Sequence, residues 1–268
     1  MLRVKLSVVC ATLLTTGLLL LSGCSSTSAD KTESMSPNTL YSEAKDEMGN
    51  GQWERAILLL EKLEAKAAGT PLAQQAQLDK GYAQYKSADT AQALATIERF
   101  MKLHPASPAL DYALYLKGMV NFNDDMGLFS KYVRQDLAER DQKASKESFE
   151  AFKELVTRFP ESRYTPDARQ RMTYIVNSLA KYEVYVARYY FRRGAYLAAI
   201  GRAQQAITDY RDVPAQEEAL SILVRAYDAL GLTQLRDDSK RVLEKTYPQS
   251  TFLAQGPKSN TDPWWKLW

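Results

Sequence analysis

The sequence predicts an all-α protein built from consecutive helical hairpins. From Pro37 to Ser250, apolar residues recur three and four positions apart, which is the period of one helix face, and no alternating strand pattern interrupts them. Gly, Pro and Asn residues divide this stretch at intervals typical of short helices. Of the 268 residues, 45% are hydrophobic, which is enough to bury a sizeable core.

Residues 1–23 have the pattern of a secretory signal. A basic start precedes an apolar run that is short for a membrane span, and the run ends in Leu21-Ser22-Gly23-Cys24. These four residues resemble the lipobox of bacterial lipoproteins, which implies cleavage before Cys24, a diacylglycerol on its sulfur and an acyl chain on its new amino group. Three acyl chains suffice for stable anchoring to a membrane. In the alternative, an ordinary signal peptide or an anchor helix, Cys24 is incidental.

Residues 24–36 are expected to form the lipidated cysteine and a flexible tether, because Ser and Thr dominate this segment. Ser25 and Ser26 follow the cysteine, with no Asp at the second position. By resemblance to enterobacterial sorting, this favours the outer membrane over the inner membrane.

Five hairpins are predicted between this tether and the C-terminal tail. The third contains an insertion at about residues 123–141, and the first helix of the fourth is long, from Arg163 to about Arg193, with a bend near Lys181. The predicted ranges are 37–68, 71–105, 108–160, 163–212 and 215–248, followed by a tail at 249–268 that contains three of the four tryptophans.

The hairpins repeat a short sequence pattern. Residues 51–57 (GQWERAI) and 194–200 (GAYLAAI) share a turn glycine, an aromatic residue, and a small residue followed by an apolar one. Gly81 and Gly118 occupy the small-residue position of other first helices, and Pro105, Pro160 and Pro248 follow second helices. The pattern resembles the tetratricopeptide (TPR) repeat, so we expect a TPR solenoid of five helical hairpins.

Three further segments resemble the BamD family, lipoproteins of the outer-membrane β-barrel assembly (BAM) machine that are also called competence lipoproteins (ComL type). The segments are 111–118 (DYALYLKG), 149–164 (FEAFKELVTRFPESRY), and 186–190 (VARYY) with 193–196 (RGAY). The lipobox, the five repeats and the insertion agree with this family in order and length. The resemblance implies a lipid-anchored, periplasm-facing scaffold of the outer membrane that recognises unfolded outer-membrane proteins and helps to insert them.

The first helices of the N-terminal repeats, within residues 37–105 and 108–160, are expected to line a concave groove. Tyrosine offers broad contact area with a polar tip, and methionine adapts to varied shapes, so this groove suits extended peptides with aromatic ends. The resemblance implies that unfolded outer-membrane proteins bind here. The alternative is that these tyrosines only pack one repeat on the next. The predicted substrate-binding residues are Tyr41, Lys45, Met48, Tyr82, Tyr85, Lys86, Tyr112 and Tyr115.

The C-terminal repeats, residues 163–248, are the predicted partner-binding half. A stripe of tyrosines at 182, 185, 189 and 196 lies on one face of the pattern, with arginines beside it. The resemblance implies that this half binds a periplasmic POTRA domain of BamA, the barrel-forming subunit, and that Arg202 pairs with a carboxylate of that domain. The alternative is a solvated charged face over a tyrosine core. The predicted partner-binding residues are Arg188, Arg192, Arg193 and Arg202.

The insertion and the tail each have several interpretations. Leu128, Phe129, Tyr132 and Val133 give the insertion a short apolar face, which either caps the core or docks another BAM lipoprotein. The tryptophans of the tail either pack on the last repeat, insert at the lipid interface or occupy a partner's groove. In a further interpretation, the tail imitates substrate and fills the N-terminal groove.

Composition argues against most catalytic and metal chemistry. One histidine and two cysteines cannot form a His-based or Cys-based metal centre or a Cys-His dyad, so no catalytic residue, metal or cofactor is predicted beyond the lipid on Cys24. Charge is nearly balanced, at 35 Lys and Arg against 32 Asp and Glu, which argues against a nucleic-acid partner. A muramidase with an acidic pair is the enzymatic alternative, but no carboxylate pair stands out, so the protein is predicted not to be an enzyme. The alternative function that remains is a TPR lipoprotein that recruits or activates cell-wall synthesis enzymes.

Overall fold

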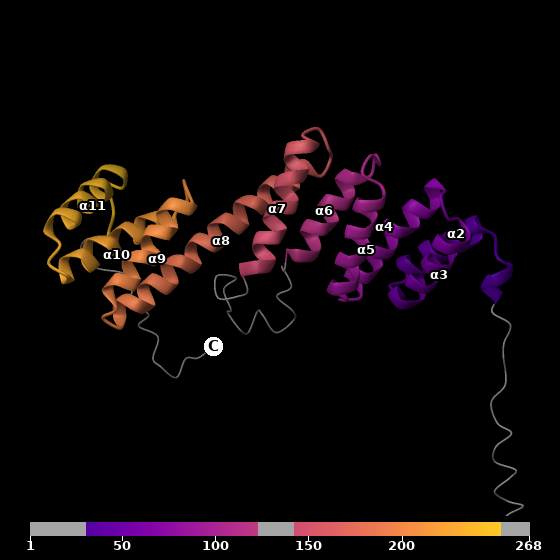
Figure 1. Cartoon of the computed structure of the whole chain (residues 1–268), viewed down its shortest axis with the longest axis horizontal. Helices are drawn as coiled ribbons and strands as arrows, with labels where there is room; N and C mark the ends of the chain where they lie inside the picture. The colour runs from indigo at the N-terminus through magenta and orange to yellow at the C-terminus, as the bar shows by residue number, and fades with distance from the viewer. Residues whose placement is uncertain (1–30, 123–141, 253–268) are drawn as a thin grey trace, which may run out of the picture.

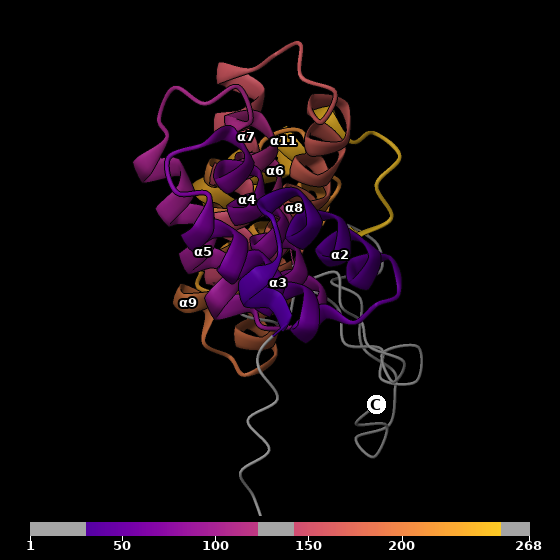
Figure 2. The same ribbon diagram turned by 90° about the vertical axis from the view of Figure 1, so that its right-hand side faces the viewer.

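The chain is entirely helical in the part that the computed structural model describes, residues 31–122 and 142–252. Ten α-helices of this part stand side by side in chain order and form one elongated row, seen from its side in Figure 1 and along its length in Figure 2. The prediction of an all-helical repeat fold is confirmed. After a short 3-10 turn, η1 (Lys31–Ser34), the helices are α2 (Pro37–Gly49), α3 (Trp53–Lys66), α4 (Pro71–Lys86), α5 (Thr90–Leu103), α6 (Leu110–Asn121), α7 (Gln142–Arg158), α8 (Thr165–Arg192), α9 (Tyr196–Asp209), α10 (Ala215–Ala229) and α11 (Thr233–Thr246).

The helices pack as five successive hairpins. α2 packs on α3, α4 on α5, α6 on α7, α8 on α9 and α10 on α11, and the second helix of each pair packs on the first helix of the next. Every pair lies within the range predicted for it. α8 runs without interruption through Lys181, where a bend was expected, and packs against both α9 and α10.

Side-chain caps fix where several helices begin. Ser36 Oγ accepts a hydrogen bond from the Thr39 N–H at the start of α2, and Thr70 caps α4 in the same way through the Ala73 N–H. A proline stands in the first turn of both helices, where the missing N–H has no helical partner to lose. Local sequence therefore sets the residues at which these helices begin.

The turns within four of the hairpins share one geometry, the Schellman motif, which requires a residue with positive φ after the first helix. Gly51, Gly194 and Gly231 supply it, at φ of 73°, 73° and 69°. In the second hairpin Ala88 takes the same place at φ of 65°, and its N–H and that of Asp89 donate to Tyr85 O and Gln84 O. A non-glycine residue in this region costs about 1–2 kcal/mol.

Gly118 brings α6 and α7 into close contact. A Cβ on this residue would lie 2.4 Å from the nearest ring atom of Phe152, a fully buried side chain of α7. Gly81 plays a milder form of the same role, since its Cβ would lie 3.0 Å from Ile97. The prediction that both glycines allow close helix packing is confirmed.

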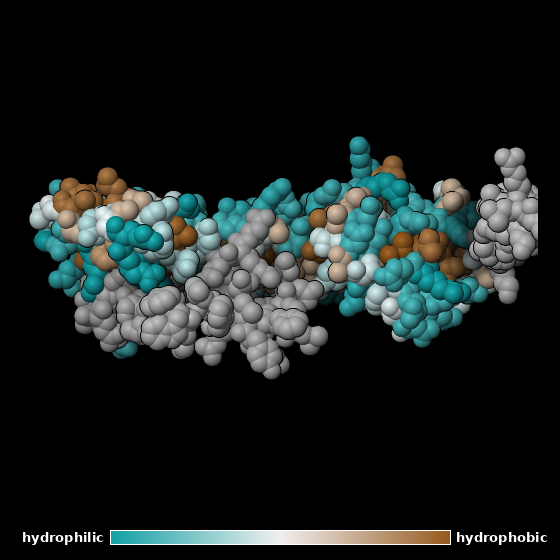
Figure 3. Space-filling model, turned by 90° about the horizontal axis from the view of Figure 1, so that it is seen from below, coloured by the Kyte–Doolittle hydropathy of each residue, from teal (hydrophilic) through white to brown (hydrophobic). Residues whose placement is uncertain are grey.

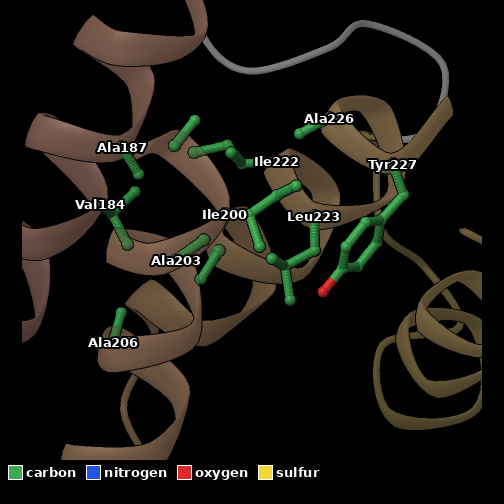
Figure 4. Packing of buried hydrophobic residues seen from close by; sticks show 11 residues of the cluster. Val184, Ala187, Ile200, Ala203, Ala206, Ile222, Leu223, Ala226 and Tyr227 are labelled. Carbon is green, nitrogen blue, oxygen red and sulfur yellow. The ribbon is translucent and has the colours of Figure 1, made fainter. Parts of the chain in front are cut away.

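The buried apolar residues form several clusters along the row. Figure 4 shows one of them, in which Val184 and Ala187 of α8, Ile200 and Ala203 of α9, and Ile222 of α10 pack together. Its small side chains let the three helices approach closely. Each cluster joins only neighbouring hairpins, which is the arrangement of a solenoid.

The two ends of the described row differ in how they are covered. At the N-terminal end, Lys66 Nζ donates hydrogen bonds to Glu33 O and Met35 O, and Met35 packs on the cluster of the first hairpin. The last part of the predicted flexible tether thus contacts the first hairpin. At the other end, the surface carries a hydrophobic patch (Figure 3), and Leu235 and Val242 of α11 are 47% and 51% exposed.

Candidate binding surfaces

An opening of about 500 Å³ lies on the N-terminal half, between α4, α6 and the turn that precedes α8. Of the predicted groove residues, only Tyr112 lines it. Three charged residues that were not predicted line it as well, namely Asp79, Asp111 and Arg163. The complete lining is Gln75, Leu78, Asp79, Ala109, Asp111, Tyr112, Arg163 and Tyr164.

Asp79 connects this opening to α2. Its side chain is almost fully buried, and it accepts hydrogen bonds from the Tyr41 hydroxyl (2.9 Å) and from Gln75 Nε2 (3.2 Å). Lys45 Nζ lies 3.7 Å from the same carboxylate. Burial and the charge of Asp79 raise the pKa of Tyr41 to about 12. Two predicted groove residues, Tyr41 and Lys45, thus meet at the Asp79 carboxylate. In the sequence, the only feature that marks Asp79 is its position two residues before Gly81.

Two tyrosines line the other side of the opening, Tyr112 and Tyr164, and Tyr115 packs on Tyr164 without lining the opening itself. The rings of Tyr115 and Tyr164 are stacked with centroids 4.7 Å apart, and Tyr112 lies 5.5 Å from Tyr164. The Tyr115 hydroxyl donates to Asp167 Oδ2 at 2.8 Å, and burial raises the pKa of Tyr112. The exposed guanidinium of Arg163 lies 4.8 Å above the ring of Tyr164. The opening therefore combines aromatic surface, two carboxylates and one exposed cation.

The remaining predicted groove residues lie farther toward the N-terminus. Tyr82 meets the edge of Trp53 at 6.1 Å, and the exposed Lys86 places its ammonium 5.9 Å from the same indole. Tyr85 is half-buried in the next cluster. Met48 is only 8% exposed and packs with Leu40 and Ala44, so its prediction as a groove contact is wrong: its side chain lies in the core of the first hairpin.

Two of the four predicted partner-binding arginines have partners within the chain. Arg188 of α8 forms a bidentate ion pair with Glu218 of α10, at 2.8 and 3.0 Å, and both side chains are largely buried. Arg202 of α9 donates from Nη1 to Glu183 Oε2 of α8 at 3.0 Å, and the Glu183 side chain is 1% exposed. Arg188, which was predicted to bind the partner, is thus engaged within the chain, and Arg202 serves first as the counterion of a buried carboxylate.

The other two arginines are on the surface near the end of α8. Arg192 and Arg193 are exposed, and the Arg193 guanidinium lies 5.2 Å from the ring of Tyr189. Tyr189 and Tyr185 are 43% and 36% exposed. Part of the predicted stripe is thus a free aromatic and cationic surface, while Tyr182, Tyr190 and Tyr196 are half-buried.

No cluster of three metal-ligating side chains occurs in residues 31–122 or 142–252. None of the helices in these ranges is both long and apolar enough to cross a bilayer. Cys24, the insertion at 123–141 and the tail from residue 253 lie outside the described residues. Paired hairpins, a tyrosine-lined opening and an exposed aromatic and basic surface define a helical-repeat protein whose surfaces suit the binding of other macromolecules.

Comparison with known proteins identifies the family. The YfiO family model, described as an outer membrane lipoprotein, matches residues 33–253. Proteins named outer membrane protein assembly factor BamD are similar over most of this chain: 46% identity in Neisseria meningitidis Z2491 (90% of each chain), 39% in Vibrio cholerae (84% of this chain, 93% of that one) and 33% in Haemophilus influenzae (83% and 84%). The chain belongs to the BamD family of outer membrane protein assembly factors.

Proposed function

We propose that this protein is a lipid-anchored scaffold of the BAM complex that receives unfolded outer-membrane proteins at its N-terminal repeats. The tyrosine-lined opening between α4, α6 and α8 is the observation that supports this proposal. Stacked rings offer contact area to aromatic side chains at low entropic cost, and the hydroxyl and carboxylate groups offer partners to the backbone of an extended segment. Such chemistry selects a type of segment rather than one particular sequence.

The C-terminal repeats, in this proposal, dock on a periplasmic POTRA domain of BamA. Arg192, Arg193, Tyr185 and Tyr189 are the residues that are free to make this contact. Arginine and tyrosine are enriched where binding energy concentrates in interfaces. Arg202 contributes its exposed side, since 40% of its side chain remains accessible beside Glu183.

In this proposal Cys24 carries the lipid, and the lipid anchors the protein to the outer membrane so that its repeats face the periplasm. The proposed role is that of a scaffold and needs no catalytic group or cofactor. Replacing Cys24 by Ala should abolish palmitate labelling and release the protein from the membrane fraction. Unchanged labelling of that variant would contradict the lipid anchor.

Variants that disrupt the peptide contact and the BamA contact separately test whether the two halves of the chain bind different partners. Arg163→Glu, alone and with Tyr112→Ser, should weaken the binding of a fluorescent peptide from the final strand of an outer-membrane protein, measured by polarisation. The same variants should still capture BamA from gently solubilised envelopes. Arg192→Glu with Arg193→Glu should give the opposite result, losing BamA and keeping the peptide.

Three results would contradict this proposal. Peptide affinity that is unchanged in the first pair of variants would remove the opening as the client site. Capture of BamA that persists in Arg192→Glu with Arg193→Glu would exclude the exposed surface of α8 as the BamA contact. Recovery of cell-wall synthases in place of BamA would favour the rival function. Circular dichroism of each variant checks that the helices are intact.

A further inference from the structure

A second opening, about 440 Å³ in volume, lies between α7, α8 and the loop that joins α9 to α10, and we call it the α7–α8 groove. Its volume is within the range of sites that enclose one or two large side chains or a small ligand. Half of its lining is apolar, from Phe149, Val156, Met172, Val176 and Val213, and the rest is Arg169, Thr173, Asn177, Arg211 and Asp212.

Three polar groups of the α7–α8 groove lack partners among the described residues. The Oδ1 atom of Asn177 is buried and accepts no hydrogen bond there, and an unsatisfied buried acceptor is unfavourable until a donor reaches it. Arg169 and Arg211 are exposed at the groove, and neither forms an ion pair within the described part of the chain. The groove therefore needs one hydrogen-bond donor and offers two cations beside apolar walls.

An indole ring meets these needs together. Its body is apolar, its Nε1–H is a donor that accepts nothing, and its face attracts a guanidinium more strongly than the face of tyrosine or phenylalanine does. A carboxylate-rich segment would satisfy the arginines but would leave the apolar walls and the Asn177 oxygen unmatched. The chemistry of the groove thus favours a tryptophan-bearing segment.

The chain itself supplies such a segment close to the groove. Trp264, Trp265 and Trp268 lie in residues 253–268, which follow the described part. The Ser221 hydroxyl of α10 donates to Phe252 O at 3.4 Å, so the chain returns from α11 across α10. α10 itself begins at Ala215, two residues after Val213 of the loop that lines the groove, so this contact brings the end of the described chain onto the helix that follows the groove.

We propose that residues 261–268 dock in the α7–α8 groove of their own chain, with tryptophan side chains between Arg169 and Arg211. The eight residues between Phe252 and this segment reach up to about 27 Å in extended conformation, which exceeds the length of α10 between Ser221 and its first residue. Attachment to the same chain also gives this segment an effective concentration of the order of millimolar at the groove. The tail then closes a surface that lies apart from the client opening and from the α8 surface.

Tryptophan fluorescence tests this docking in the full-length chain. Trp53 is the one other tryptophan, so Trp53→Phe leaves emission from the tail alone. In this background we expect blue-shifted emission and weak quenching by acrylamide, which is uncharged. Arg169→Glu with Arg211→Glu should shift the emission to the red and increase quenching, with the helical circular dichroism unchanged because both residues are exposed. Lys240→Glu with Arg241→Glu, two reversals on the exposed face of α11, should change neither signal.

Other outcomes overturn the proposal. Solvent-like emission in the Trp53→Phe background would show that the tail is free for a membrane or another protein. Shielded emission that survives the groove variant but is lost in Leu235→Asp with Val242→Asp would place the tail on the apolar patch of α11. A second groove variant, Asn177→Leu, removes the unsatisfied acceptor, and unchanged quenching in both groove variants would also contradict the docking.

Discussion

Arg202 and Glu183 illustrate how a tertiary partner decides the role of a residue. Glu183 is 1% exposed, and the nitrogen of Arg202 at 3.0 Å is its ion-pair partner in the described structure. The family resemblance predicted that Arg202 pairs with a carboxylate of a partner, whereas in the structure it pairs with a carboxylate of its own chain. A buried charge without its counterion is costly, so Arg202 also supports the fold.

Reversal of Arg202 should therefore destabilise the fold. Arg202→Glu is expected to lower the free energy of unfolding by about 3 kcal/mol, since it sets two carboxylates against each other at a buried site. Arg192→Glu on the exposed end of α8 is the matched control and should change it by less than about 0.5 kcal/mol. Urea unfolding of both variants measures the difference, and equal stability would contradict the structural role of Arg202.

Glu64 is a second carboxylate that holds elements together. It accepts hydrogen bonds from Gln77 Nε2 (2.7 Å), Lys80 Nζ (2.8 Å) and Arg99 Nη2 (2.8 Å), and so joins α3 to α4 and α5. Burial acts to raise the pKa of Glu64, but the hydrogen bonds from Lys80 and Gln77 outweigh it and hold this pKa below its ordinary value of 4.5.

The stabilising contribution of Glu64 should disappear in acid. A carboxyl whose pKa is lower in the folded state contributes fully above its unfolded pKa and loses that contribution as pH falls through the folded pKa. Glu64→Gln should thus cost about 2 kcal/mol at pH 7, and the gap to the parent should narrow below pH 4.5. Glu61→Gln is the control, since Glu61 is 51% exposed and 3.9 Å from Lys80. A gap that stays constant from pH 7 to pH 3 would contradict this role.

At the scale of the helix, the sequence predicts which segments are helical better than it predicts which side chains of those helices are exposed. The repeated glycines, the prolines after second helices and the apolar period were sufficient to predict all five hairpins. They could not assign Met48, because a residue at the border of a helical stripe turns to core or groove depending on how far the next helix is rotated. Asp79, Asp111 and Arg163 were not singled out because their convergence depends on how α4, α6 and the turn before α8, which are distant in sequence, pack together.

Close packing of α6 on α7 makes Gly118 intolerant of a methyl group. Gly118→Ala is expected to lower the free energy of unfolding by about 2 kcal/mol or more, because its Cβ would lie 2.4 Å from the Phe152 ring. Gly201→Ala in α9 is the matched control: nothing lies within 4 Å of its Cβ, so helix propensity should stabilise the variant by up to about 1 kcal/mol. Thermal unfolding of the two variants should shift in opposite directions, and a neutral Gly118→Ala would contradict the close contact.

At the scale of the whole molecule, the buried residues form separate clusters. We therefore expect a destabilised hairpin to unfold before the rest of the molecule does. Leu40 is fully buried in the first hairpin, so Leu40→Ala should cost about 2–5 kcal/mol there and leave the later hairpins intact. With the three tail tryptophans replaced by Phe, Trp53 reports on that hairpin alone. Its fluorescence transition in urea should then precede the loss of helicity.

The opposite end of the row supplies the control for this experiment. Leu243 is the buried residue of α11, and Leu243→Ala should leave the Trp53 transition at or after the loss of helicity. Coincident transitions in Leu40→Ala would show that the solenoid unfolds as one cooperative unit.

The length of α8 sets a fixed distance between the two proposed contacts. Tyr164 stands just before its first residue and Arg192 is its last, so the helix holds them about 40 Å apart. An extended polypeptide needs about 12 residues to cover that distance. An unfolded protein bound at the tyrosines can therefore reach the proposed contact at the other end only with a segment at least as long as a whole transmembrane β-strand. The length of α8 thus sets the minimum length of an unfolded segment that can contact both sites at once.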